Sequence, residues 1–278
     1  MKRYAIRTFY DGRNYHGYQR QPSLPTIEGF LIKALIETGY VESPENNRFR
    51  SASRTDKHVN AIGNVFAFDT NKPLVLDQLN ASLPNDKSIV CWSSAEVNSK
   101  FTPKYSKSKK YWYILLSSHL KKKTSMSLKD ISTIFSQFEG EHDFRLFCKI
   151  DDRNTVRTIN KCNIITKGDS IVFEIEASSF LWEQVRRIVS YILNFNELPE
   201  KFQELQKLLR TNTCIENLNI EPAKPNQLVL VEHHYENIEW NTSQKAVEQV
   251  GIRCNKLLDK LKQEEAMLES IQEFFETK

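Results

Sequence analysis

The sequence predicts an α+β protein of two ferredoxin-like subdomains, with mainly antiparallel sheets, helices on one sheet face and a long C-terminal helix. Over about the first hundred residues, strand and helix patterns follow the order β-α-β-β-α-β, which is typical of a ferredoxin-like unit. The second half loosely repeats an order of strand, helix, hairpin, helix and strand, without a detectable sequence repeat. Residues 242–278 then follow one helical pattern with many charges of both signs.

The composition fits a folded protein of one large or two small domains. A chain of 278 residues with 16 Phe, 10 Tyr and 4 Trp can build a sizeable core. Its five cysteines never form a C-x-x-C pair, which argues against a zinc site or a disulfide framework and favours a reducing compartment. No apolar N-terminal segment or long uncharged apolar run is present, so we expect a cytoplasmic protein without a membrane partner.

In the first half of the chain, changes in the spacing of apolar residues predict where strands and helices lie. Residues 3–9 alternate polar and apolar side chains, as a half-buried strand does. Apolar residues at helical spacing then predict a helix that Thr26 caps and Gly39 ends. A strand at 65–68, a helix at 74–83 and a strand at 89–92 follow.

A polar loop with the sequence S-A-S-R-T-D-K-H-V-N precedes the strand at 65–68 and contains Arg54 and Asp56. An Asp in such a loop is most often only a turn former. An ionised carboxylate there could also act as a nucleophile or a proton acceptor. Residues 10–21 form a second loop, in which aromatic side chains and Arg20 would suit contact with bases and phosphates, or simply with water.

Between residues 100 and 123 there are eight lysines and no acidic residue, and aromatic residues are interleaved with them. Lysine runs are usually solvated faces, but this mixture favours a nucleic-acid groove, with Lys107, Lys109 and Lys110 as candidate contacts. Residues 110–115 alternate as a strand that carries Tyr111 and Tyr113 on one face.

The rest of the second half contains a linker candidate at 121–127, a helix from Ser127, and a hairpin across residues 159–176. Helices at 181–192 and 199–209 and a closing strand at 228–231 follow. By default Arg186 is a surface residue, but it lies at the edge of an apolar helix face, from which it could reach inward. His142 and Asp143 could form an acid–base pair or simply brace the fold.

Several of these stretches together resemble the TruA-type tRNA pseudouridine synthases, over about residues 4–235. The matching segments are Y-H-G-Y-Q-R-Q at 15–21, R-T-D at 54–56, K-Y-W-Y-I at 110–114, G-E-H-D-F at 140–144, F-L-W-E-Q-V-R-R-I-V at 180–189 and L-V-L at 228–230. The sequence departs from the family pattern at His58 and Gln227, where Gly is usual, and at Asn60, where His is usual.

The resemblance implies isomerisation of uridine to pseudouridine in tRNA, in the anticodon stem-loop, without a cofactor or a metal, by a homodimer. It implies domains at 1–103 and 104–240, followed by a helical extension at 241–278. The implied catalytic residues are Asp56, Tyr111 (which stacks on the extruded uracil) and Arg186. The implied substrate-binding residues are Arg54, which contacts the RNA, and Leu228, which packs beside the base, together with Arg20 and the three lysines. A guanidinium beside Asp56 would oppose the rise in pKa that burial causes, so we expect Arg186 to reach it across a cleft between the two halves.

Two other functions are compatible with parts of the sequence. The chain could be an RNA-binding protein that has lost catalysis, although the retained Arg54, Asp56, Tyr111 and Arg186 argue against this. A metal-dependent hydrolase could use three histidines and Asp56, but His16, His58 and His142 show no ligand spacing.

The C-terminal extension carries apolar residues at a heptad spacing. Val247, Cys254, Leu261, Leu268 and Phe275 recur every seven residues, and Val250, Leu257 and Ile271 interleave, with Glu264 as the one break. Such a stripe needs a partner, which is either the enzyme's own body or another subunit's tail. We expect Asn241-Thr242 to cap the helix and the helix to dock along the body or dimer, outside the catalytic cleft.

Overall fold

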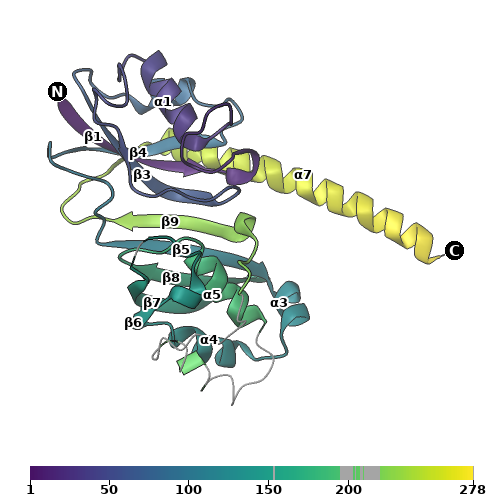
Figure 1. The fold of residues 1–278 in the computed structure, drawn as a ribbon. Helices are drawn as coiled ribbons and strands as arrows, with labels where there is room; N and C mark the ends of the chain where they lie inside the picture. The colour runs from purple at the N-terminus through teal and green to yellow at the C-terminus, as the bar shows by residue number, and fades with distance from the viewer. Residues whose placement is uncertain (153, 195–202, 204, 207–208, 210–219, 278) are drawn as a thin grey trace.

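The computed structural model describes residues 1–278 except 153, 195–202, 204, 207–208, 210–219 and 278, which are drawn in grey in Figure 1. A ten-stranded sheet runs through both halves of the body in the order β10-β4-β1-β3-β9-β5-β8-β7-β6, with β2 paired to β3. Its strands are β1 (Lys2–Tyr10), β2 (Arg50–Ser51), β3 (Asn60–Thr70), β4 (Ile89–Val97), β5 (Ser108–Leu116), β6 (Gly140–Asp143), β7 (Val156–Lys167), β8 (Ser170–Ala177), β9 (Leu228–His234) and β10 (Asn241–Thr242).

The sheet is mostly antiparallel, as predicted, and its two halves meet where β3 pairs in parallel with β9. This junction is short: Asn60 lies opposite Val229 and Ala61 lies opposite Leu230. Gly63 permits the close approach, because a Cβ at this position would lie 2.7 Å from the backbone oxygen of Val231. The sheet therefore continues from the half that carries Asp56 into the half that carries Arg186.

The helices form two groups beside this sheet (Figure 1). They are α1 (Ile27–Glu37), α2 (Leu76–Ala81), α3 (Ser117–Lys123), α4 (Leu128–Ser136), α5 (Gln184–Leu193) and α7 (Gln244–Glu276), with short 3₁₀ turns η1 (Gly12–Asn14), η2 (Arg145–Phe147) and η3 (Pro225–Gln227). In the first half, α1 and α2 cover a core that contains Ile6, Phe66 and Phe68. In the second half, α4 and α5 cover a core that contains Phe173 and Ile175.

Helix boundaries follow local capping. The Thr26 side chain accepts a hydrogen bond from the Gly29 N–H at the start of α1, as the sequence predicts. The linker expected at 121–127 is wrong in its first part, because residues through Lys123 belong to α3. The helix predicted at 74–83 is shorter, and the one predicted at 199–209 lies largely outside the described residues. None of the helices in the described part of the chain combines the length and apolar character needed to cross a membrane.

Two expectations for the C-terminal helix are wrong. Ser243, rather than Asn241-Thr242, caps it, because the latter two residues pair with β4 as β10. Docking of the whole helix along the body of its own chain is also contradicted: past Leu257 every described residue of α7 is exposed, and Figure 1 shows the helix leaving the body. An amphipathic face alone does not determine whether the surface it meets is long enough to cover it.

Candidate active site

The loop that carries Asp56 connects β2 to β3 and is held by buried polar contacts. The hydroxyls of Tyr10 and Thr55 lie 2.8 Å apart, and Asn64 Nδ2 donates a hydrogen bond of 3.0 Å to the Ser53 carbonyl. Gly12 packs directly against the loop, since a Cβ there would lie 2.2 Å from the Val59 oxygen. The 10–21 loop, for which the sequence predicts contact with RNA or solvent, therefore also supports the backbone around Asp56.

The two unusual residues of this loop have structural roles. His58 has a φ of 68°, so it occupies the left-handed conformation that a Gly at this position would favour. Asn60 accepts a hydrogen bond from the Gly12 N–H at 2.9 Å and donates one to the Asn226 carbonyl at 3.0 Å. Asn60 thus ties the loop to the segment that precedes β9, a contact that sequence reasoning missed.

Arg186 reaches Asp56 from the other half of the chain. The distance from Arg186 Nη1 to Asp56 Oδ2 is 3.1 Å, and Arg186 Nε donates a 2.7 Å hydrogen bond to the Ala223 carbonyl. The side chain of Arg186 is 10% exposed and that of Asp56 is 32% exposed. The carboxylate is therefore open to a ligand on one side while its partner is held from behind.

Burial and its neighbours set the ionisation of Asp56. Burial raises the pKa of Asp56, the positive charge and hydrogen bond of Arg186 lower it, and the negative charge of Glu183 raises it again. A hydrogen bond to the Trp182 side chain also lowers the pKa. The net pKa lies above the ordinary aspartate value, so the ion pair only partly offsets the cost of burying the charge.

Tyr111 lies on β5 between the two halves and contacts both cores. Its ring packs edge-on against Phe180 at a centroid distance of 5.3 Å. Burial raises the pKa of Tyr111, so its hydroxyl stays protonated at neutral pH. Leu228, at the start of β9, is 6% exposed and belongs to the core of the second half. Asp56, Arg186 and Tyr111 are therefore brought together from a loop, a helix and a strand.

Comparison with known proteins shows which protein family this chain resembles. A family model described as tRNA pseudouridine synthase matches residues 134–236. A curated protein named tRNA pseudouridine synthase A from Methanothermobacter thermautotrophicus is 36% identical, with 84% of this chain and 82% of that protein aligned. The chain belongs to the tRNA pseudouridine synthase A family. Relatives of the same name from Pyrococcus abyssi (39% identical; 88% and 89% aligned) and Methanosphaera stadtmanae (33%; 95% and 93%) agree.

Two residues of the segment that leads to Arg186, Trp182 and Glu183, stand at positions that the family signature leaves variable. Glu183, the residue just before α5, is in a left-handed conformation with φ of 62°, and its carboxylate forms an ion pair with Arg187 at 2.7 Å. Trp182 is 41% exposed, and Lys149 Nζ lies 4.1 Å from the centre of its ring. Sequence reasoning read both only as helix residues; the adjacent charged pattern E-x-x-R-R was the available signal.

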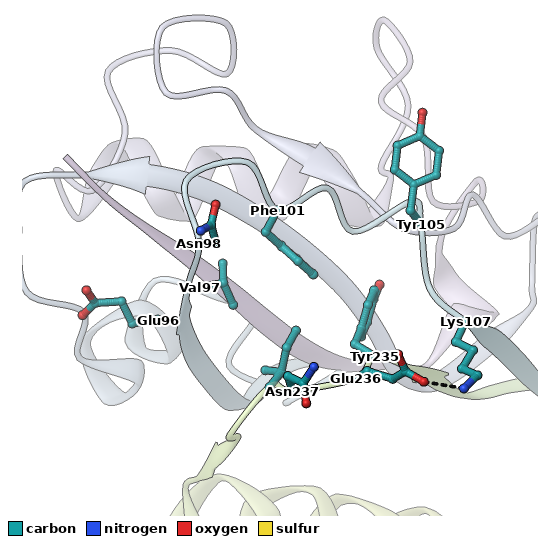
Figure 2. A pocket seen from close by; sticks show the side chains of 10 residues that line it. Glu96, Val97, Asn98, Phe101, Tyr105, Lys107, Tyr235, Glu236 and Asn237 are labelled. Atoms are coloured by element: carbon teal, nitrogen blue, oxygen red, sulfur yellow. Dashed lines mark hydrogen bonds and ion pairs between the residues drawn. The ribbon is translucent and has the colours of Figure 1, made fainter.

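Two of the lysines predicted to contact tRNA lie on opposite faces of strand β5. Arg54 and Arg20 are exposed. Lys109 lies on the same strand face as Tyr111, whereas Lys110 lies on the other face and approaches Glu176 at 3.9 Å. Lys107 forms an ion pair with Glu236 at the edge of a separate pocket of about 450 Å³, which Phe101 and Tyr235 also line (Figure 2). One continuous groove formed by Lys107, Lys109 and Lys110 is thus not supported.

The residues considered for metal binding are dispersed. The His58 ring nitrogen Nδ1 lies 3.0 Å from the Arg13 carbonyl, and His142 Nε2 lies 2.7 Å from the Glu139 carbonyl. Within the described part of the chain, no three His, Cys, Asp or Glu side chains gather closely enough to hold a metal ion.

A buried ion pair connects α7 to the loop that supports Asp56. Arg253 Nη2 lies 2.6 Å from Asp11 Oδ2, and both side chains are less than one-tenth exposed. Burial raises the pKa of Asp11, but hydrogen bonds from Arg13 and Arg253 outweigh this and bring the pKa down to about 2. Since the pKa is depressed below its ordinary 3.8, the stability from this carboxylate is present above pH 4 and is lost as the pH falls toward 2.

We expect Arg253→Gln to lower the free energy of unfolding by about 2 kcal/mol at pH 7, because a buried charged hydrogen bond is lost. The pKa of Asp11 should rise, so acid unfolding should begin at a higher pH than in the wild type. Urea and acid titrations followed by circular dichroism measure both effects. Lys256→Gln, at an exposed position of the same helix, is the matched control. Equal stability and equal acid unfolding of the two variants would contradict a stabilising role for the Arg253–Asp11 ion pair.

Proposed function

We propose that this protein isomerises uridine to pseudouridine in tRNA, with Asp56 as its catalytic carboxylate. The observation that carries the proposal is the 3.1 Å ion pair between Asp56 and Arg186, at the junction of the two halves, in a chain of the tRNA pseudouridine synthase A family. An exposed carboxylate edge, a buried guanidinium and a neighbouring tyrosine are the groups that this reaction needs around the sugar and the base.

The reaction breaks the bond between ribose C1′ and base N1 and forms a bond between C1′ and C5. N1 gains a proton and C5 loses one, so the composition of the RNA does not change. An ionised Asp56 can attack the sugar as a nucleophile or remove a sugar proton, and both roles require the deprotonated form. Arg186 favours that form by its charge and its hydrogen bond.

The target nucleotide must leave the helical stack for the glycosidic bond to reach Asp56, at a cost of roughly a few kcal/mol. The exposed Arg54, two residues before Asp56, is placed to contact the RNA where the base leaves. Tyr111 stacks on the uracil, and Leu228 packs beside the base. The edge contact with Phe180 restrains the Tyr111 ring, which reduces the entropy lost when the base binds.

The same proposal includes the finer features that the family resemblance implies. The target lies in the anticodon stem-loop, and the enzyme acts in the cytoplasm as a homodimer. Residues 1–103 and 104–240 are two ferredoxin-like subdomains that share the continuous sheet, and residues 241–278 form an extension.

Two measurements on one sample test the function. The protein is incubated with tRNA that carries tritium at uridine C5, and tritium released to solvent is counted while pseudouridine is mapped in the same RNA. Release together with new pseudouridine is the expected result. Tight tRNA binding without release would instead support the RNA-binding protein that has lost catalysis.

We expect Lys109→Gln to weaken tRNA binding and to lower the slope of log affinity against log salt by about one, because one phosphate contact is lost. Lys107→Gln should change both much less, since Lys107 already forms an ion pair with Glu236. Burial lowers the pKa of Lys109 to about 8, so wild-type affinity should also fall as the pH rises past this value. Binding titrations at several salt concentrations compare the variants, and equal effects would contradict this division of the lysines.

A further inference from the structure

Trp182 is an exposed aromatic side chain beside the catalytic carboxylate. It is 41% exposed, whereas the other three tryptophans, Trp92, Trp112 and Trp240, are all partly buried. A hydrogen bond from the Trp182 side chain to Asp56 places the indole next to the reacting centre. A single exposed aromatic residue on a protein surface is ordinary, but this one borders the place where the RNA must bind.

Lys149 holds Trp182 by two contacts. Its backbone N–H donates a 2.9 Å hydrogen bond to the Trp182 carbonyl, and its ammonium nitrogen lies 4.1 Å from the centre of the indole ring. A cation over an aromatic face is attracted to it, so this contact limits rotation of the ring. Because the lysine can cover only one face, the exposed remainder of the indole is available to a ligand.

The chain just before α5 turns sharply, and this turn keeps Trp182 at the surface. Phe180, two residues earlier, packs against the core of the second half. Glu183 has a φ of 62°, a conformation that residues other than Gly rarely adopt, and it is held there by its ion pair with Arg187 at 2.7 Å. The turn separates Trp182 from the helix, so Trp182 stays exposed while Arg186 on the helix is buried.

Single-stranded RNA is the ligand that suits an exposed aromatic ring with a lysine beside it. Proteins that bind unpaired nucleotides stack bases on aromatic side chains and contact phosphates with lysines. When the target uridine leaves the stack, the neighbouring base loses one stacking partner and presents a free face. Asp56 must meet the ribose of the target, so a ring that bonds Asp56 lies beside that ribose.

We propose that Trp182 is the stacking platform for the base next to the target uridine, and that Lys149 contacts the phosphate of that neighbouring nucleotide. The inference rests on the proposed function and adds two substrate-binding residues to it. Tyr111 stacks on the flipped uracil, whereas Trp182 stacks on the base that remains in the strand. Because stacking tolerates every base, the platform orders the strand rather than selecting one base.

The first test measures tRNA binding by the Asp56→Asn protein, in which turnover does not interfere. Adding Trp182→Ala should weaken binding by roughly 10- to 100-fold, as loss of one base–aromatic stack does. Adding Trp182→Phe, which keeps a ring, should stay within a few-fold. Weakening by both changes to the same extent, or by neither, would overturn the inference.

Trp112→Ala in the Asp56→Asn protein is the matched control. Trp112 also lies beneath a lysine, with Lys167 Nζ 4.0 Å from the centre of its ring. It follows Tyr111 on β5 and therefore lies on the opposite face of the sheet. Trp112→Ala should bind tRNA as the Asp56→Asn protein does, and weakening equal to that of Trp182→Ala would overturn the inference.

The second test concerns the lysine. Lys149→Gln should lower the slope of log affinity against log salt by about one, because one phosphate contact is lost. Lys167→Gln removes the equivalent lysine from Trp112 and should leave the slope unchanged. An unchanged slope in Lys149→Gln would overturn the assignment of Lys149 to a phosphate.

The third test removes the base instead of the ring, and a merely structural role for Trp182 would not affect its result. Once the modified uridine is mapped, tRNAs with an abasic nucleotide on its 5′ or its 3′ side are compared with intact tRNA. One of the two should bind the Asp56→Asn protein roughly 10-fold more weakly or worse. The same RNA change should cost little when Trp182→Ala is also present, because the stack is already lost.

Additive losses from the abasic nucleotide and from Trp182→Ala would overturn the inference. Tritium release by the wild type tests the isomerase separately. Release together with additive losses would overturn only the stacking platform, whereas absence of release would overturn the proposed function.

Discussion

Asp56→Asn should reduce pseudouridine formation by at least about 10³-fold, because the amide can neither attack the sugar nor accept a proton. The carboxylate is 32% exposed and faces the open side of its ion pair with Arg186, so the substitution removes charge without leaving a cavity. Tritium release from C5-labelled tRNA measures the rate. Binding of tRNA should stay within a few-fold, because affinity comes mainly from phosphate contacts.

The matched control for this change is Asp11→Asn. Asp11 is likewise an aspartate paired with arginine, but its partners are Arg13 and Arg253 rather than Arg186. Asp11→Asn should lower stability and leave turnover by the folded enzyme nearly unchanged. Pseudouridine formation by Asp56→Asn at a rate near that of Asp11→Asn would remove Asp56 from its assigned role.

The meeting of Asp56 and Arg186 was expected because the family resemblance singled out both residues. The chemistry gave a reason for pairing them, since a carboxylate that must stay ionised in a closed site needs a cation. By helix periodicity alone Arg186 was a surface residue that could reach inward. The helix cap at Thr26 was also readable, since it depends on one side chain and its local backbone.

Features that depend on contacts between segments far apart in the sequence could not be predicted from the sequence alone. The β3–β9 junction consists of two residue pairs far apart in sequence, and periodicity carries no signal for which strand edges meet. The Lys107–Lys110 run looked like one basic groove, but strand alternation places Lys109 and Lys110 on opposite sheet faces, and Lys107 and Lys110 have different acidic partners. The heptad stripe of α7 predicted burial that holds only in part: Val250 and Leu257 are half-buried, Val247 and Cys254 are exposed, and every described residue of α7 beyond Leu257 is exposed.

Arg186→Gln should reduce kcat/KM by roughly 10² to 10³-fold, the usual cost of removing one electrostatic contact in an active site. It should also change the pH profile in a defined direction. The pKa of Asp56 is already raised by burial, and Arg186 is the main group that opposes this rise. Without the guanidinium the pKa rises further, so a higher pH is needed to ionise Asp56 and reach the plateau of activity.

Arg187→Gln is the matched control for the pH profile, because Arg187 follows on the same helix and bonds Glu183 and the Ile220 carbonyl but not Asp56. The acid limb of its pH profile of kcat/KM should coincide with that of the wild type even if the variant enzyme is less stable. Arg186→Lys keeps a positive charge near the carboxylate and should return the limb partway toward the wild-type position. The limb of kcat/KM reports the ionisation of the free enzyme, so stopped assays at subsaturating tRNA across the pH range measure it directly. An acid limb that stays in place in Arg186→Gln would mean that Asp56 is not the group whose ionisation controls the rate.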